Sequence, residues 1–295
     1  MSQRITPCLW FEKDARELCK FYTSIFTDSE VKNVRTLKGT PSGTVEVVTV
    51  RLRDLESTLL VAGSFFKFTP AVSFLVACET KGEVEALWAK LAEGGKPLME
   101  LGEYPFSEKY GWMEDRYGLS WQVMCVAGRA IEQRITPTLM FVGKQCGRAE
   151  EAMKFYATVF NKSKIDGIFR YGEGELPDKP GTVKHASFTL EGQKFAAMDS
   201  AYAHAFTFNE AISFTVHCET QEEIDHYWGK LSADPAAEQC GWLKDKYGLS
   251  WQIVPAVMDE MFKDKDEKKT ARVTAAFLKM KKFDIESLKR AYEGN

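Results

Sequence analysis

The stretch YGWMEDRYGLSWQVM at residues 110–124 returns as CGWLKDKYGLSWQIV at residues 240–254, 130 positions later in the chain. The two stretches share GW, an acidic residue, and YGLSWQ at the same spacing. Their recurrence indicates an internal duplication, because a match of this length with fixed spacing marks a repeated structural unit. Two other segments also occur twice and in the same order: RITPCLWF (4–11) as RITPTLMF (134–141), and FKFTPAVSFLVACET (66–80) as FTFNEAISFTVHCET (206–220).

The same pattern of strands and helices runs through both copies. Each copy opens with an apolar run that predicts a strand, followed by an amphipathic helix and an extended run rich in β-branched residues. A further strand, a second helix that begins at a capping threonine, and a last strand close the copy. Each copy therefore reads as two βαβββ units in an α+β fold. The expected elements are 5–11, 14–26, 44–52, 71–77, 80–91 and 120–126 in the first copy, and 135–142, 146–160, 182–190, 211–217, 220–231 and 250–254 in the second.

The chain beyond Pro255 has a different composition. It is rich in Lys, Asp, Glu, Ala and Met, and its apolar residues recur at helical spacing, which predicts two helices. We interpret this tail as a helical appendage packed on a domain, with an amphipathic partner-binding helix as the alternative. The predicted organisation is thus a first domain at 1–128, a second at 133–256, and a helical extension at 257–295.

Composition and charge narrow the classes of function. The 295 residues include 39 basic and 42 acidic ones, for a net charge of −3, and this balance favours neither nucleic acid nor an anionic membrane as a partner. No apolar run approaches the roughly 20 residues that span a bilayer. The seven cysteines are odd in number and form no CxxC, so we expect a reducing, cytoplasmic location without a disulfide framework.

The repeated motifs ITPCLWF, KFYTSIF, FKFTPAVSFLVACET and GWMEDRYGLSWQ resemble those of a known family. Paired βαβββ units of this kind are similar to the vicinal-oxygen-chelate superfamily of glyoxalases, dioxygenases and resistance proteins. Within it, the chain resembles the PhnB-like branch, also described as 3-demethylubiquinone-9 3-methyltransferase-like, over nearly its whole length. The methyltransferase description is not matched by a Gly-rich loop for S-adenosylmethionine after a strand.

The resemblance implies a place for one divalent metal ion. In the superfamily, facing strands supply histidine and glutamate ligands and leave positions open for substrate oxygens. An amide oxygen is a poorer ligand than a carboxylate, and the other matching positions here carry no ligating side chain at all. We therefore expect no metal and no other cofactor. The matching residues are Thr6, Pro7, Ala71 and Gln122 in the first copy, and Thr136, Pro137, Ala211 and Gln252 in the second.

Alternation along the strands predicts which side chains face a cleft. Successive side chains of a strand point to opposite faces, so the polar residues of the second copy fall together on one face. The first copy is less polar, because Val47 and Ala77 replace the two histidines. We therefore place the binding site in the second copy. Its predicted cleft residues are His185, Ser187, Thr189, Ser213, Thr215, His217 and Gln252, with Gln122 as the counterpart in the first copy.

His185 and His217 are the candidate catalytic residues, because neutral imidazoles can act as base or acid near pH 7. A structural hydrogen-bonding role is the alternative for both. Asp199 ends a strand and is a candidate ligand-binding residue, with a turn or capping role as its alternative.

Three functions remain open at this stage. The first is metal-independent binding of a small molecule in the second cleft. The second is a superfamily lyase, isomerase or dioxygenase with an atypical metal site that includes both histidines. The third is the methyltransferase that the family description implies. We expect the two copies to pair within one chain, and a further homodimer is equally compatible with the sequence.

Overall fold

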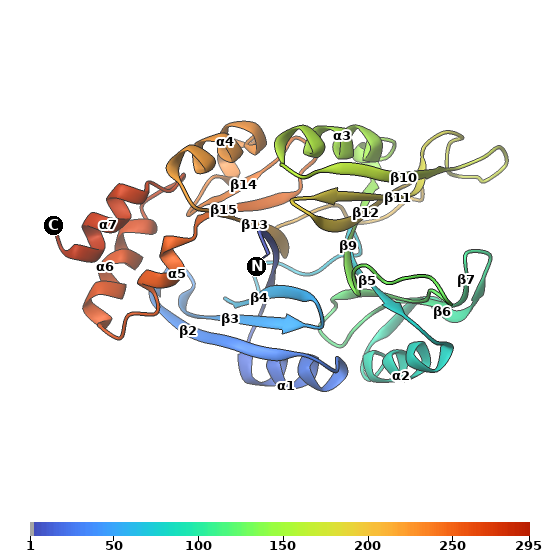
Figure 1. Ribbon diagram of the computed structural model, residues 1–295, viewed down its shortest axis with the longest axis horizontal. Coiled ribbons are helices and arrows are strands. Elements are labelled where there is room, and N and C mark those ends of the chain that lie inside the picture. Colours follow the sequence, from blue (N-terminus) through green and yellow to red (C-terminus); the bar gives the residue numbers. More distant parts are fainter. Residues whose placement is uncertain (1–2) are drawn as a thin grey trace.

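The computed structural model describes residues 3–295 and contains the duplicated units followed by three tail helices (Figure 1). The first repeat comprises β1 (Ile5–Phe11), α1 (Ala15–Ile25), β2 (Glu30–Thr40), β3 (Gly43–Leu52), β4 (Leu55–Val61), β5 (Val72–Cys78), α2 (Lys81–Leu91), β6 (Lys96–Tyr104), β7 (Ser107–Glu114) and β8 (Ser120–Cys125). The second comprises β9 (Ile135–Val142), α3 (Ala149–Val159), β10 (Lys164–Arg170), β11 (Val183–Leu190), β12 (Gln193–Ser200), β13 (Ile212–Cys218), α4 (Gln221–Leu231), β14 (Trp242–Lys244) and β15 (Ser250–Pro255). The tail comprises α5 (Val257–Met261), α6 (Glu267–Phe277) and α7 (Ile285–Glu293).

Each of the two sheets contains strands from both repeats. The seven-stranded sheet has the order β14-β15-β13-β1-β4-β3-β2, and the eight-stranded sheet has the order β10-β11-β12-β9-β5-β8-β7-β6. Strand β1 pairs antiparallel with β13, and β5 pairs antiparallel with β9, so both sheets cross from one repeat to the other at their centres. Each concave face therefore lies between the repeats.

The helices cover the outer sides of the sheets. In Figure 1, α1 and α2 of the first repeat lie below, and α3 and α4 of the second lie above. The seven-stranded sheet opens toward the tail, and the eight-stranded sheet opens at the opposite end. One apolar core runs through all four helices and both sheets. The α+β fold of paired repeats is therefore confirmed.

Several expectations about single elements are refined by the structure. Thr80 and Thr220 cap α2 and α4, as predicted, by accepting hydrogen bonds from the backbone N–H groups of Glu83 and Glu223. Strand β6, between the second helix and the last strand of the first repeat, has no counterpart among the expected elements. The edge strands β2 and β10 were not predicted, since their exposed residues lack a strong alternation. The tail contains three helices rather than two.

The repeated DxYGLSW segment places a buried carboxylate at the centre of each repeat. Asp115 accepts hydrogen bonds from the Tyr22 hydroxyl at 2.9 Å, the Trp121 indole N–H at 2.9 Å, and the backbone N–H groups of Tyr117 and Leu119 at 2.8 and 3.1 Å. Burial raises the pKa of Asp115, while the donors act in the opposite direction. Because Tyr22 lies on α1 and Trp121 on β8, the carboxylate joins the helix over one sheet to a strand of the other.

Asp245 repeats this arrangement in the second copy. It accepts from the Tyr156 hydroxyl at 2.7 Å, the Trp251 indole at 2.9 Å, and the backbone N–H groups of Tyr247 and Leu249 at 2.8 and 3.1 Å. Here α3, over the eight-stranded sheet, is tied to β15 of the seven-stranded sheet. The recurring aspartate, tryptophan and helical tyrosine thus have a structural role.

We expect Asp115→Asn to lower the thermal unfolding midpoint by roughly 5–10 °C, because a destabilisation of about 2–4 kcal/mol follows when an amide N–H₂ faces buried donors. Differential scanning calorimetry measures the change. Glu93→Gln removes the same charge at an exposed side chain and should shift the midpoint by less than about 2 °C. Equal midpoints for the two variants would show that the buried carboxylate is not a main support of the fold.

Candidate functional site

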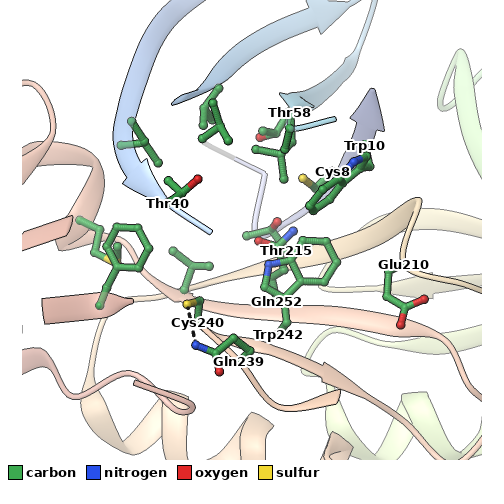
Figure 2. Close-up of a pocket in the computed structure, with 18 of the residues that line it drawn as sticks. Cys8, Trp10, Thr40, Thr58, Glu210, Thr215, Gln239, Cys240, Trp242 and Gln252 are labelled. Carbon is green, nitrogen blue, oxygen red and sulfur yellow. Dashed lines mark hydrogen bonds between the residues drawn. The ribbon is translucent and has the colours of Figure 1, made fainter. Parts of the chain in front are cut away.

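A cavity of about 510 Å³ lies in the concave face of the seven-stranded sheet (Figure 2). Its floor comes from β1, β4, β13 and β15, and one wall comes from β2 and β3. The helices α5 and α6 and the segment that follows α6 close the opposite side. The site is therefore built from the first unit of the first repeat, the second unit of the second repeat, and the tail.

Polar side chains cross the middle of the cavity floor. Cys8 on β1 lies in register with Thr58 on β4 and with Ser213 on β13. Thr215 is in register with Gln252, whose side-chain N–H₂ donates to the Ser213 hydroxyl at 2.9 Å. This row offers hydroxyl, thiol and amide groups for hydrogen bonds, and no charge.

A histidine lies beside this row. The Nε2 atom of His217 is hydrogen-bonded to the Thr6 hydroxyl at 3.0 Å. Burial lowers the pKa of His217, which keeps the imidazole neutral at pH 7. Burial also raises the pKa of the Cys8 thiol to about 11, so that this sulfur is protonated and a poor nucleophile.

Aromatic rings line both ends of the cavity. Trp10 makes edge contacts with Phe66, at 5.0 Å between ring centroids, and with Trp242, at 6.2 Å. At the tail end, Phe277 makes edge contacts with Phe262 and Phe283, at 6.1 and 6.2 Å. The polar floor is thus bounded by two aromatic groups that can pack on a flat ligand.

The charged groups of the lining are paired. Arg35 on β2 donates to Asp259 of α5 at 3.1 Å, and its guanidinium lies 5.2 Å from the centre of the Phe262 ring. Glu56 pairs with Lys32 at 2.5 Å, and Glu210 pairs with Lys244 at 2.7 Å. The Arg35 contacts join the first repeat to the tail across the cavity mouth.

Backbone hydrogen bonds fasten the tail to the second repeat. The N–H groups of Cys240 and Gly241 donate to the carbonyls of Met280 and Lys281 at 2.8 and 2.7 Å. Gly241 has φ +82°, and a Cβ atom there would come within 2.5 Å of the Phe283 ring. A side chain at this position would displace the tail, so glycine is required for its docking.

The predicted site residues are divided between the two sheets. His217, Thr215 and Gln252 line the cavity, and Ser213 lies directly beneath it as the partner of Gln252. The remaining predicted residues belong to the eight-stranded sheet: His185, Ser187 and Thr189 on β11, Asp199 on β12, and Gln122 on β8.

The prediction of one cleft that holds both His185 and His217 is therefore wrong. Alternation along each strand assigned the side chains to faces, but β11 and β13 lie in different sheets. The physical reason is that β13 pairs with β1 of the first repeat instead of with its own repeat's first unit. His185 stands on the eight-stranded sheet, where burial lowers its pKa.

Asp199 has a structural position. Its carboxylate accepts hydrogen bonds from the backbone N–H groups of Gly147, Ala149 and Val183, at 2.7, 3.1 and 2.9 Å. Two of these donors belong to the first turn of α3 and the residues before it, where N–H groups have no partner within the helix. The capping alternative is the one that this geometry supports.

Sequence reasoning missed the cavity residues of the first repeat. Cys8, Trp10 and Thr58 occupy the floor and one end, and the tail contributes Asp259 and Phe262. Comparison of the repeats could have identified the three residues of the first repeat, because their counterparts in the second repeat differ. Thr138, Met140 and Ala196 occupy the corresponding positions in the eight-stranded sheet.

The eight-stranded sheet fills the corresponding space differently. There the Tyr110 hydroxyl donates to the Gln122 side-chain oxygen at 2.7 Å, and the Gln122 N–H₂ donates to Ser73 at 2.8 Å. Cys240 stands at the position of Tyr110 in the second repeat and lines the cavity. Tyr110 fills the space above Gln122. The smaller Cys240 leaves the corresponding space above Gln252 open.

The residues of the site do not fit the superfamily's divalent metal. Among residues 3–295, no group of three His, Cys, Asp or Glu side chains is arranged to hold an ion. Within the cavity, Cys8 is protonated, Gln252 presents an amide, and Asp259 is engaged by Arg35. Metal sites in proteins require deprotonated ligands in a converging set, which this cavity lacks.

Comparison with known proteins identifies the repeats. The family model for 3-demethylubiquinone-9 3-methyltransferase matches residues 3–124 and again residues 133–254. A PhnB protein from Bacillus cereus is 39% identical over 42% of this chain and 100% of its own, with a TM-score of 0.39. Protein PA1353 from Pseudomonas aeruginosa is 23% identical over 42% of this chain and 98% of its own, with a TM-score of 0.37.

A tandem relative has the same fold. Glyoxalase I from Zea mays is 13% identical, covers 89% of this chain and 96% of its own, and superposes with a TM-score of 0.56. This shared fold, together with the double match of the family model, confirms the arrangement of two tandem domains. None of the curated proteins compared with the chain matches it. In the part of the chain that the structure describes, every helix is too short or too polar to cross a membrane.

We expect the stability of the protein to fall as the pH is lowered from 7 through 6.5, the ordinary histidine pKa, toward the depressed folded values. His217 and His185 have lowered pKa values because of burial, so the unfolded chain binds more protons in this window and is stabilised relative to the folded state. Thermal midpoints measured between pH 7.5 and 5 test this. His217→Gln should reduce the slope, because it removes one of the buried imidazoles. A slope equal to that of the unaltered protein would contradict the assignment.

Proposed function

Because the chain belongs to the 3-demethylubiquinone-9 3-methyltransferase family of the vicinal-oxygen-chelate superfamily, we propose that its seven-stranded sheet binds a small organic molecule without the superfamily's metal. The site is the cavity between β1, β4, β13, β15 and the tail. The eight-stranded sheet, like the seven-stranded one, joins the two repeats through strand pairing.

One observation carries this proposal: a cavity of about 510 Å³ is lined by apolar walls and a short polar row. Small-molecule sites of about 300–1,000 Å³ have this character, with a few polar groups that fix the orientation of the ligand. The row of Cys8, Thr58, Thr215 and Gln252 provides those groups. A tail that covers the mouth excludes water and increases the apolar area that a ligand buries.

The two catalytic alternatives are less well supported by the side chains. A metal-dependent lyase, isomerase or dioxygenase needs a converging ligand set, and the two histidines assigned to it in the sequence lie on different sheets. Methyl transfer, which the family's description names, needs a site for a sulfonium donor with an amino-acid group. In the cavity the carboxylates and Arg35 already pair with one another or with nearby lysines.

Binding of the neutral fluorescent probe N-phenyl-1-naphthylamine tests the proposal. Leu60→Trp places a larger side chain in the cavity beside Trp10. It should lower the affinity for the probe by about tenfold or more, which corresponds to about 1.4 kcal/mol. Met198→Trp is the matched control, because Met198 is in register with Met140 at the same place in the eight-stranded sheet. Equal affinity of the two variants, or greater loss in Met198→Trp, would place the site elsewhere.

A metal analysis and a ligand titration separate the alternative functions. Protein purified without chelators should contain less than about 0.1 equivalent of zinc, nickel, manganese or iron, since no converging ligand set is present. Calorimetric titration with S-adenosylmethionine at millimolar concentration should give no saturable heat. A stoichiometric metal would support the metal-dependent enzyme, and a saturable heat would support methyl transfer; either result would contradict the proposal.

A further inference from the structure

We propose that the ligand of this cavity is an uncharged molecule with a flat, unsaturated ring system and at least one hydrogen-bonding oxygen. This inference rests on the proposed binding function and specifies the chemical class that the site selects. Three features of the lining carry it: the pairing of its charges, the placement of its aromatic rings, and the chemistry of its floor.

Every ionisable side chain of the lining is either paired or neutral. Four are engaged in ion pairs, and burial keeps the other three uncharged at neutral pH, since it lowers the pKa of the histidine and raises the pKa of each thiol. The paired groups are Arg35, Asp259, Glu56 and Glu210; the neutral groups are His217, Cys8 and Cys240. A charged ligand would lose its hydration without gaining a free counter-charge, which is unfavourable.

Arg35 is the one cationic side chain of the lining that could bind an anion, and residues of the tail already contact it. Its Nη1 atom donates to Asp259, its guanidinium plane lies over Phe262, and its Nε atom is buried without a hydrogen-bond partner. An anionic ligand would have to displace Asp259 to reach the guanidinium. Asp259 therefore acts as a built-in carboxylate that makes the site selective against anions.

The aromatic side chains favour a flat ligand. Trp10 and Trp242 contact each other at an interplanar angle of 70°, and Phe66 lies at 88° to Trp10. At the tail end, Phe277 and Phe283 are also perpendicular, at 90°. Rings arranged at right angles leave both a face and an edge for a third ring, and such aromatic pairs add to the stabilisation that area burial provides.

The floor specifies the polar part of the ligand. Thr58 and Thr215 present hydroxyls from neighbouring parts of the sheet, and Gln252 presents an amide close to Thr215 (Figure 2). Hydroxyl and amide groups can donate to a carbonyl oxygen or accept from a hydroxyl. A ring carbonyl or phenolic hydroxyl directed at this row would be satisfied without any charge.

Isothermal titration with four molecules of one size tests the inference: 1-naphthol, 1-naphthoate, 1-naphthylmethylammonium and decahydro-1-naphthol. The first is neutral and flat, the next two carry a negative and a positive charge, and the last is neutral but saturated. We expect 1-naphthol to bind at least about tenfold more tightly than each of the others, a difference of about 1.4 kcal/mol. The charge selection would be overturned if naphthoate or the ammonium compound bound as tightly as 1-naphthol. The requirement for a flat ring would be overturned if decahydro-1-naphthol did.

An Asp259 variant separates charge selection from general binding. Asp259→Asn leaves Arg35 without its carboxylate, so naphthoate affinity should rise by about tenfold while that for 1-naphthol changes little. Glu260→Gln, on the same helix and with an exposed side chain, is the control and should change neither. Unchanged naphthoate binding in Asp259→Asn would contradict the role given to this residue.

The outcomes distinguish this inference from the binding function on which it rests. If a charged or saturated compound binds best and Leu60→Trp still weakens it, the cavity is a binding site and only the ligand class is wrong. If none of the four compounds nor the fluorescent probe binds in a way that depends on Leu60, the binding function itself fails.

Discussion

The buried aspartate of the repeated DxYGLSW segment makes, in each repeat, the contacts on which the architecture depends. Asp115 and Asp245 each gather a tyrosine hydroxyl, a tryptophan N–H and two backbone N–H groups. Each of these sites joins a helix over one sheet to the last strand of the same repeat, which belongs to the other sheet. The pairs β1–β13 and β5–β9 join the repeats within each sheet. The two sets of contacts run in different directions, so neither a sheet nor a repeat can move alone. A rigid frame of this kind can keep a cavity open at the junction of the repeats.

Duplication has allowed the two concave faces to diverge. Both keep a glutamine bonded to a serine on the neighbouring strand, as Gln122 with Ser73 and Gln252 with Ser213. In one face a tyrosine fills the space above the glutamine; in the other a cysteine leaves the space free, and the C-terminal tail closes it. Strand pairing between the repeats uses both sheets, whereas the proposed ligand site uses the concave face of one of them.

The sequence was sufficient for the local structure and insufficient for the partition of strands. The duplication, the caps at Thr80 and Thr220, and the buried face of each strand follow from spacing and alternation, which depend on near neighbours. The assignment of β11 and β13 to different sheets does not, because β13 pairs with β1, about 200 positions away, and the same alternation is compatible with either partner. The tail's apolar spacing likewise predicts a buried face without indicating the surface it covers, so Asp259 and Phe262 could not be placed in the site.

A crystal structure of the protein soaked with 1-bromonaphthalene tests the central claim most directly, because the anomalous signal of bromine locates a flat, uncharged ring without reference to activity. The account predicts one strong bromine peak in the cavity of the seven-stranded sheet, between the floor at Cys8 and the tail at Phe277. A peak only on the concave face of the eight-stranded sheet, or no ordered bromine in a crystal whose cavity is open to solvent, would contradict it.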